Sequence, residues 1–119
     1  MRALRILSLS ALGVVLASCV YETIDQSPCP PGGTQLTYAN FGKGFMDQWC
    51  QSCHGSMAVT RLGAPGEFIF DNIEEIQRHR DRIFVRAAAT NDSMPPGPMD
   101  PSIADRNRLA EWLACGAPP

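Results

Sequence analysis

Cys50, Cys53 and His54 have the types and the spacing to do chemistry together. They belong to the pentapeptide Cys50-Gln51-Ser52-Cys53-His54. Two thiols one helical turn apart can each add to a vinyl group of a haem, and the adjacent imidazole can then bind the iron. The pattern predicts one covalently bound haem c, attached through Cys50 and Cys53, with His54 as an axial ligand of the iron.

The same Cys-x-x-Cys spacing also occurs in thiol–disulfide oxidoreductases and in zinc proteins. Trp49 favours the first of these, because a tryptophan often precedes a redox-active cysteine pair. Such an oxidoreductase needs a buried strand leading into the motif, whereas residues 40–48 contain two glycines and amphipathic spacing. A zinc site would need a second pair of ligands with similar spacing, which the chain does not provide. A thiol–disulfide oxidoreductase using Cys50 and Cys53 is therefore the alternative function.

The amino terminus has the pattern of an export signal. Arg2 and Arg5 precede an apolar run over residues 6–16, which is shorter than the about 20 residues of a membrane-spanning helix. The run ends in Leu16-Ala17-Ser18-Cys19, which resembles the lipobox of bacterial lipoproteins. We expect residues 1–18 to be a lipoprotein signal peptide and Cys19 to carry lipid. An ordinary cleavage site with an incidental cysteine and a permanent anchor helix are the alternatives.

Lipidation at Cys19 implies a protein anchored to a membrane on the periplasmic side of a bacterium. Val20 stands where an aspartate would suggest retention at the inner membrane, so the outer membrane is favoured. Residues 19–33 end in a run of proline and glycine that cannot continue a helix or a sheet, and we expect a tether there. After removal of the signal peptide, 8 basic and 12 acidic residues remain, a formal charge of −4 that excludes nucleic acid as a partner.

The five cysteines can be assigned almost completely. If Cys19 carries lipid and Cys50 and Cys53 carry haem, Cys29 and Cys115 are left. Thiols of exported proteins tend to pair in an oxidising compartment, so we expect a Cys29–Cys115 disulfide. Two free thiols are the alternative.

Helical periodicity dominates the rest of the chain. Aromatic residues recur at three- and four-residue intervals from Tyr38 to Trp49, the spacing of one helix face. Further helices are predicted over about 72–78 with Asp71 as the cap, over 81–89, and from the capping Ser102 to a stop at Gly116. No segment alternates with period two, so residues 34–119 are predicted to form one all-α domain.

These features together resemble class I cytochromes c, over roughly residues 37–116. Gly42 and Met46 stand eight and four residues before the first haem cysteine, where that family has a glycine and a large apolar residue packed against the carboxy-terminal helix. Trp112 and Leu113 look like their partners there. Pro65 is placed like the family proline whose carbonyl accepts a hydrogen bond from the ligand histidine, a bond that would fix the orientation of the ring.

The resemblance also implies a sixth iron ligand from a loop after the middle helices. Met94, in the sequence Ser-Met-Pro-Pro forty residues past the ligand histidine, resembles the axial methionine of the family. Met99 in the same proline-rich region is its first competitor. Met57 lies too close to His54 in sequence to reach the opposite face of the haem ring. His79 sits among arginines, which indicate a solvated helix face.

Several other side chains are expected around the haem. The apolar crevice is predicted to be formed by Phe68, Phe70, Ile83, Phe84 and Leu109. Arginine suits bidentate contacts with carboxylates, so three arginines are candidates to pair with the haem propionates: Arg61, Arg82 and Arg86.

Taken together, the pattern predicts a small cytochrome c-like helical domain wrapped around one covalently bound haem. Iron with histidine and thioether ligands keeps both ligands in both oxidation states, which suits electron transfer rather than catalysis. We expect a membrane-anchored electron carrier, not an enzyme, that passes single electrons from a donor to an acceptor protein. A free-standing monomer and a subunit of a respiratory complex are both open alternatives.

Overall fold

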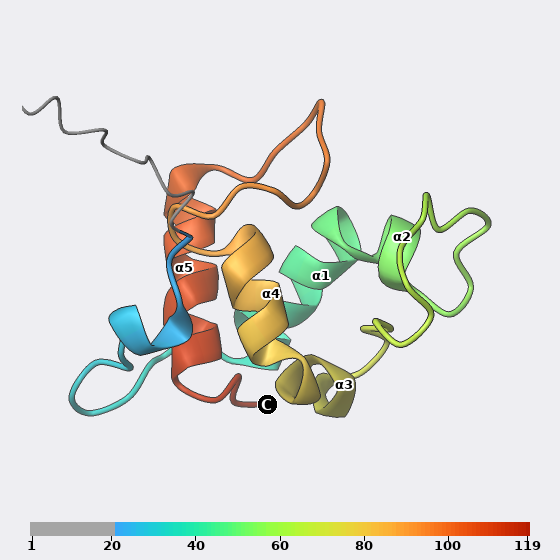
Figure 1. Ribbon diagram of the computed structural model, residues 1–119. Coiled ribbons are helices and arrows are strands. Elements are labelled where there is room, and N and C mark those ends of the chain that lie inside the picture. The colour runs from blue at the N-terminus through green and yellow to red at the C-terminus, as the bar shows by residue number, and fades with distance from the viewer. Residues whose placement is uncertain (1–20) are drawn as a thin grey trace, which may run out of the picture.

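A computed structural model of the chain describes residues 21–119, and this part of the chain is helical without strands, as predicted. The part of the chain that the structure describes contains five α-helices. Figure 1 shows them joined by loops, with α4 beside α5. The elements in chain order are a 3-10 turn η1 (Ile24–Gln26), a π-helical turn η2 (Tyr38–Gly42), α1 (Lys43–Trp49), α2 (Gln51–His54), α3 (Ile73–Arg78), α4 (Arg80–Ala87) and α5 (Ile103–Ala114).

The helices begin where the local sequence satisfies their first amide groups. The Thr37 hydroxyl accepts a hydrogen bond from the Asn40 amide at the start of η2, and Ser102 does the same for the Asp105 amide in α5. The cap of α3 differs from the prediction: Asn72, not Asp71, accepts from the Glu75 amide. Asp71 lies one residue too early to reach that amide, and its carboxylate accepts from the Ser56 amide instead.

The end of α5 follows the prediction that Gly116 stops it. Gly116 has φ +89°, a conformation that glycine adopts without steric cost. The Ala117 amide then donates to the Trp112 carbonyl and the Gly116 amide to the Leu113 carbonyl. This is the hydrogen-bond pattern of a Schellman cap, which satisfies the last carbonyls of the helix.

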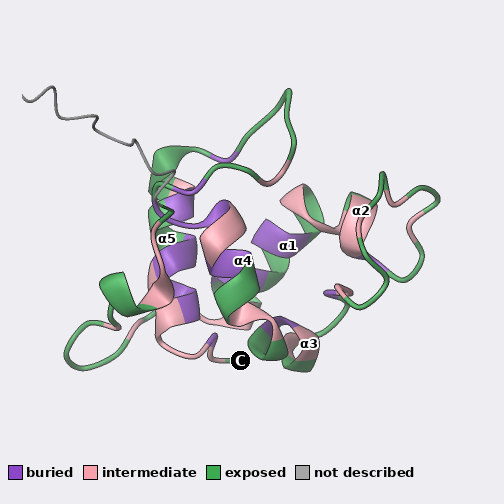
Figure 2. Cartoon of the chain, viewed as in Figure 1, coloured by how far each residue is buried: buried purple, intermediate pink, exposed green. Residues whose placement is uncertain are grey.

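The core is formed mainly by buried residues of η2–α1, α4 and α5. Figure 2 shows the buried segments of α1, α4 and α5 in purple. Phe84 in α4 and Leu109 and Trp112 in α5 are fully buried, and α4 packs along α5. The Trp112 ring also contacts the aromatic rings of Tyr38 and Phe41. The carboxy-terminal helix therefore packs against η2, which leads into the helix α1 that precedes the cysteine motif.

Gly42 makes this packing possible. A Cβ at position 42 would lie 2.4 Å from two ring atoms of Trp112, closer than atoms can approach. Met46, one turn further, is 1% exposed, and Leu113 is fully buried. The expectation that Gly42 and Met46 face Trp112 and Leu113 is thus consistent with the burial of all four residues and with the direct approach of Trp112 to Gly42.

Replacing Gly42 with alanine is expected to lower the free energy of unfolding by about 2–3 kcal/mol, because the new methyl group overpacks the core against Trp112. Gly44 provides the matched control, since a Cβ there meets no atom within 4 Å. Gly44→Ala should stabilise the protein by about 0.5–1 kcal/mol through helix propensity. Urea unfolding of both variants checks the pair, and equal effects at the two positions would contradict the close approach.

Residues 22–29, which belong to the tether expected over residues 19–33, are held against the helical domain. The Asn91 side chain accepts a hydrogen bond from the Glu22 amide and donates one to the Glu22 carbonyl, and η1 packs against α4 and α5. Hydrogen bonds from Ser27 and Thr90 lower the pKa of the Glu22 carboxyl. The sequence suggested a tether because proline and glycine dominate its end, but the polar contacts to Asn91 hold the residues before that end.

The predicted Cys29–Cys115 disulfide is present, with a Cα–Cα distance of 4.7 Å. It joins the amino-terminal segment to the residue that follows α5. The expected signal peptide over residues 1–18 and the expected lipid attachment at Cys19 lie outside the described residues. None of the helices over residues 21–119 is long and apolar enough to cross a membrane.

Candidate functional site

The cysteine motif lies at a bend between two helices. Cys50 separates α1 from the single turn α2, and its carbonyl accepts hydrogen bonds from the amides of Cys53 at 3.2 Å and His54 at 2.9 Å. The two cysteine thiols are free of disulfide bonds and partly buried. The backbone of the motif is therefore a closed helical turn that presents both thiols and the imidazole from one short element.

The His54 ring is held in one orientation by two contacts. Its Nδ1 lies 2.9 Å from the Phe68 carbonyl oxygen, and the ring stacks on Phe70 with 4.7 Å between centroids. Because a carbonyl only accepts hydrogen bonds, Nδ1 is the protonated nitrogen. The Nε2 lone pair is then left to bind a metal, which is the arrangement of metal-ligating histidines in proteins.

The partner of His54 corrects the expectation that Pro65 would supply this carbonyl. The Pro65 carbonyl instead accepts from the Phe68 amide at 3.1 Å and from Arg61 Nη2 at 2.8 Å. The turn closed by the Pro65–Phe68 bond directs the Phe68 carbonyl toward the histidine. The hydrogen bond that fixes the orientation of the His54 ring is therefore made by the carbonyl of Phe68, three residues after Pro65.

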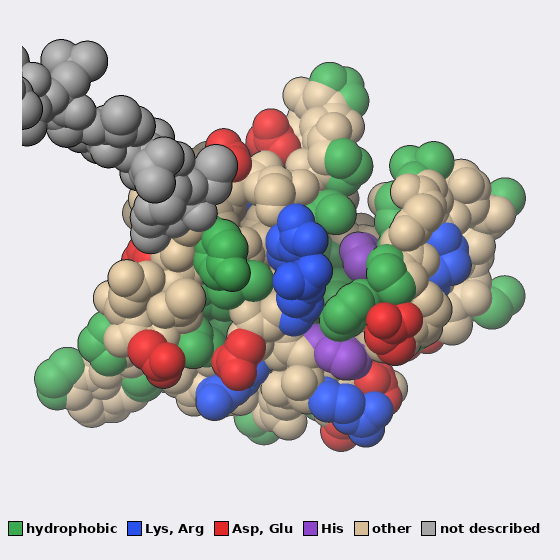
Figure 3. Space-filling view, in the orientation of Figure 1, with side chains coloured by type: hydrophobic (Ala, Val, Ile, Leu, Met, Phe, Trp, Pro, Cys, Tyr) green, Lys and Arg blue, Asp and Glu red, His purple; other side chains and the backbone are tan. Residues whose placement is uncertain are grey.

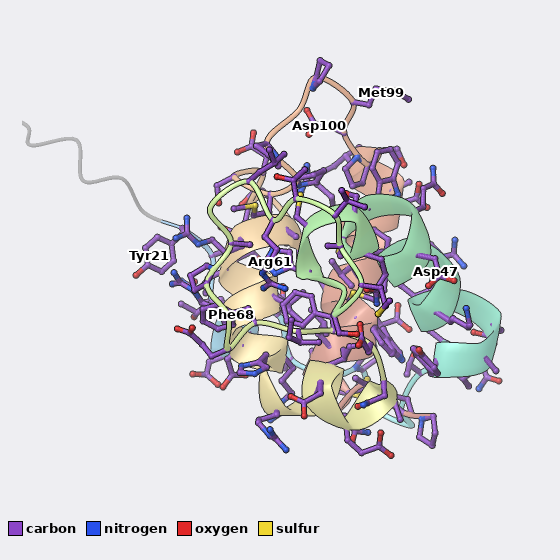
Figure 4. The ribbon with its side chains drawn as sticks, turned by 90° about the vertical axis from the view of Figure 1, so that its right-hand side faces the viewer. Tyr21, Asp47, Arg61, Phe68, Met99 and Asp100 are labelled. Atoms are coloured by element: carbon purple, nitrogen blue, oxygen red, sulfur yellow. A yellow bond between two sulfur atoms is a disulfide. The ribbon has the colours of Figure 1, made fainter. Side chains whose placement is uncertain are left out.

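Arg61 organises the loop that follows the motif. Its guanidinium donates to four backbone carbonyls, those of Gly55, Ala64, Pro65 and Phe68. These bonds engage four of the five N–H donors of the guanidinium, so the structure gives Arg61 a role in shaping the loop. Arg61 also lines the cavity beside the motif, as do the other two arginines that were expected near the haem propionates. Figure 4 shows Arg61 and Phe68 together on this loop, in front of α4.

A second set of contacts fixes the loop to the motif. The Asp71 carboxylate accepts from the Ser56 amide, and hydrogen bonding to Ser56 lowers the pKa of Asp71. The Gln51 amide group donates to the Phe70 carbonyl, and the Phe70 amide donates to the His54 carbonyl at 2.9 Å. Gln51, inside the motif, therefore ties the segment that carries Phe70 to the turn that carries His54.

The motif opens into a cavity of about 680 Å³. Cys50, Cys53 and His54 line one side, and Ile83 and Ala87 of α4 line another. The walls are mainly apolar, and the volume lies within the roughly 300–1,000 Å³ typical of cofactor sites. In Figure 3, hydrophobic and histidine side chains lie next to a stripe of basic side chains over α4 on this face.

Met94 lines the same cavity as His54, in the loop after α4. It is partly buried against the core, and its amide donates to the Arg86 carbonyl at 2.8 Å. Met99 also lines the cavity but is 74% exposed. Figure 4 labels it near the tip of the loop at the top of the view. The backbone of Met94 is therefore the better fixed of the two.

The two remaining candidates for a sixth ligand lie elsewhere. Met57 is 90% exposed and does not line the cavity. His79 caps α3, packs edge-on against Phe68 and has its Nε2 3.9 Å from a Glu75 carboxylate oxygen. Neither residue borders the cavity that His54 faces.

The expected apolar crevice is correct in part. Phe68, Phe70 and Ile83 line the cavity, whereas Phe84 and Leu109 are fully buried in the core behind it. Phe84 and Leu109 therefore support the wall through α4 and α5 without forming it. Periodicity marked both as buried but could not tell the core from the cavity wall.

Arg82 and Arg86 of α4 line the cavity, as expected of residues that contact propionates. The Arg82 guanidinium lies 5.9 Å from the Phe68 ring centroid. Arg86 Nη1 is 3.5 Å from the Ser93 hydroxyl, a contact at the limit of hydrogen bonding. Both guanidinium groups thus retain donors for an anionic group at the edge of the cavity.

Two polar residues that sequence reasoning missed hold the loop with Met94. The Arg106 guanidinium, 4% exposed, donates to the carbonyls of Ala87, Asn91 and Met94. Asn91, 6% exposed, donates to the Phe84 carbonyl. The available signal was a charged residue in the apolar stripe of α5, since position 106 shares a helix face with Leu109.

The residues around the cavity fit a covalently attached haem. Two thiols, an imidazole with its Nε2 lone pair left to bind iron and the thioethers of Met94 and Met99 all border one apolar space. Three guanidinium groups, those of Arg61, Arg82 and Arg86, border it as well. Among residues 21–119, no group of three histidine, cysteine or acidic side chains is placed to hold a metal ion by itself. An imidazole and a thioether are a pair of donors that suits an iron already held by a porphyrin.

Comparisons of the chain with protein-family models, with curated proteins and with solved structures gave no match.

Proposed function

We propose that the protein is a monohaem c-type cytochrome that carries single electrons between redox proteins. The observation that carries the proposal is the cavity bordered by Cys50, Cys53, His54 and Met94. Cys50 and Cys53 would form the thioether bonds, and His54 and Met94 would be the axial ligands. When bound, the haem iron would take up and release one electron, alternating between iron(III) and iron(II).

The surrounding residues have distinct roles in this proposal. The Phe68 carbonyl orients the His54 imidazole and increases its basicity as a ligand. Phe68, Phe70 and Ile83 line the cavity and would exclude water from a bound haem, which would favour the less charged iron(II) state. Arg82 and Arg86 would contact the propionates.

With two axial ligands the iron would have no open position, and the described residues that line the cavity include no carboxylate and no second histidine to act as an acid or base. The proposal is therefore electron transfer rather than catalysis. Both partners would be redox proteins that dock at the open side of the cavity. With the expected lipid on Cys19, the carrier would work at a bacterial membrane, on its periplasmic side.

The alternative, a thiol–disulfide oxidoreductase, is less well supported. Burial and the neighbouring Cys53 raise the pKa of the Cys50 thiol to about 12. The attacking cysteine of such enzymes has a lowered pKa, because the thiolate is the nucleophile. No strand precedes the motif, since residues 38–49 are helical.

Covalent haem in the purified protein tests the proposal. The full chain is produced in a bacterium that attaches haem to Cys-x-x-Cys-His motifs, and the reduced pyridine haemochrome is recorded after acidic acetone extraction. A c-type spectrum that stays with the polypeptide is the expected result. The Cys50→Ala/Cys53→Ala double variant should lose all covalent haem, while Cys29→Ser/Cys115→Ser should keep it. Wild-type protein without covalent haem would refute the proposed function.

A further inference from the structure

The loop between α4 and α5 carries Met94 and has no secondary structure of its own. It runs from residue 88 to residue 102, fifteen residues in all. Loops of this length inside a small domain need side-chain contacts to adopt one conformation. What holds this loop therefore decides where Met94 lies.

Arg106 of α5 contacts the loop along most of its length. Its Nη1 donates to the carbonyls of Ala87, Asn91 and Met94, each at 2.9 Å. Its own carbonyl accepts from the Ala89 amide at 3.0 Å, and its Nη2 lies 3.6 Å from a carboxylate oxygen of Asp100. One residue thus joins the start, the middle and the end of the loop to a single helix.

The position of Arg106 is costly unless these contacts are made. The side chain is 5% exposed, whereas Asp100 is 53% exposed and too distant for a hydrogen bond. Burying a guanidinium requires partners for its donors. The carbonyls of Asn91 and Met94 in the loop and of Ala87 at the end of α4 supply partners for Nη1, whereas Nη2 has no hydrogen-bond partner among the described residues. The two loop carbonyls are in place only while the loop stays closed, so the burial of Arg106 favours the closed loop.

We propose that Arg106 is the positioning residue for the axial methionine. It keeps the Met94 loop closed over the cavity and so keeps the thioether competitive with other ligands for the iron. This inference rests on the proposed function. A thioether is a weak ligand, so a shift of the loop toward open conformations would expose the iron to foreign ligands.

Imidazole binding to the oxidised, full-length protein tests the inference. Arg106→Met removes the hydrogen bonds of the side chain while keeping much of its volume, and should raise imidazole affinity about tenfold or more. Arg106→Lys keeps the charge but loses the fork of donors, so a smaller increase is expected. Arg108→Met is the matched control on the exposed side of α5, and should bind imidazole like the wild type.

A second control separates positioning from general stability. Ile76 is buried in α3, away from the loop, and Ile76→Val lowers stability without touching Arg106. Its imidazole affinity should remain that of the wild type. Hydrogen exchange gives a readout independent of the haem. Compared with the wild type, the exchange rates of the Ala89 and Met94 amides should increase more in Arg106→Met than those of the α5 amides.

The outcomes separate the two proposals. A folded Arg106→Met or Arg106→Lys protein that keeps covalent haem and wild-type imidazole affinity overturns the role of Arg106 and leaves the proposed function intact. If Arg106→Met does not fold, Arg106→Lys decides. An equal gain of affinity in Ile76→Val also overturns it, because the effect would then be one of stability. Wild-type protein without covalent haem refutes the proposed function itself.

Discussion

Met94→Ala is expected to abolish the weak near-infrared band that a methionine sulfur bound to oxidised haem iron produces, while the covalent haem remains. The reduction potential should fall by on the order of 0.1 V or more, because axial ligands set haem potentials across roughly 0.8 V and methionine raises them. An optical spectrum of the oxidised protein and a redox titration measure both effects.

The physical reason for choosing Met94 is the way its backbone is held. Its amide donates to the Arg86 carbonyl in α4, and its carbonyl accepts from Arg106 in α5. Met94 is therefore tied to the two longest helices of the domain, whereas the side chain of Met99 is 74% exposed. A ligand that must stay on the iron through each electron transfer needs such a fixed backbone.

Met99→Ala is the matched control for this variant, because both methionines line the cavity. It should keep the near-infrared band and a potential close to that of the wild type. A band that survives in Met94→Ala but disappears in Met99→Ala would assign the ligand to Met99. That result would change only the assignment of the axial ligand and would leave the proposed attachment of haem through Cys50 and Cys53 unaffected.

The parts of the fold that could be predicted from the sequence are those set by local chemistry. Ser102 caps α5, and Gly116 ends it at a positive φ that glycine tolerates. The family resemblance predicted that Gly42 packs against Trp112, and in the structure Gly42 lies against the Trp112 ring. In each case a residue type has few alternatives at its position, so the sequence constrains the structure strongly.

The parts that could not be predicted depend on tertiary geometry. Whether Pro65 or Phe68 reaches His54 depends on the turn between them, which the sequence does not specify. The placement of Phe84 and Leu109 behind the cavity rather than in its wall depends on the rotation of α4 and α5. Arg106 on an apolar helix face has no local explanation, because its partners belong to a loop whose path is set only by packing.

The contacts of the amino-terminal segment 22–29 also depend on tertiary geometry and could not be predicted from the sequence. Its proline and glycine content suggested a tether, but Asn91 binds both backbone groups of Glu22. Asn91 also contacts Arg106 through its carbonyl, so the amino-terminal segment and the Met94 loop share one residue. The amino-terminal segment is thus part of the structure that surrounds the candidate site. The Cys29–Cys115 disulfide holds this segment to the end of α5.

Opening the Cys29–Cys115 disulfide is expected to lower the free energy of unfolding by about 4–5 kcal/mol before any effect of the haem, since the bond closes a loop of 86 residues in the unfolded chain. A covalent haem already restricts the unfolded chain, so the loss in the complete protein should be nearer 4 kcal/mol. At about 4 °C or more per kcal/mol for a domain of this size, the melting temperature should fall by about 15 °C. Thermal unfolding of Cys29→Ser/Cys115→Ser measures the change.

The single variants provide the sharpest control for this prediction. Cys29→Ser and Cys115→Ser each open the same loop, so each should lose nearly as much stability as the double variant, and the effects should be far from additive. Additive losses would mean that the two side chains act through separate contacts. Because the disulfide acts mainly on the unfolded chain, the near-infrared band of the folded double variant should match that of the wild type, whereas Arg106→Met should weaken that band. The two variants therefore separate the bond that stabilises the fold from the contacts that place the methionine.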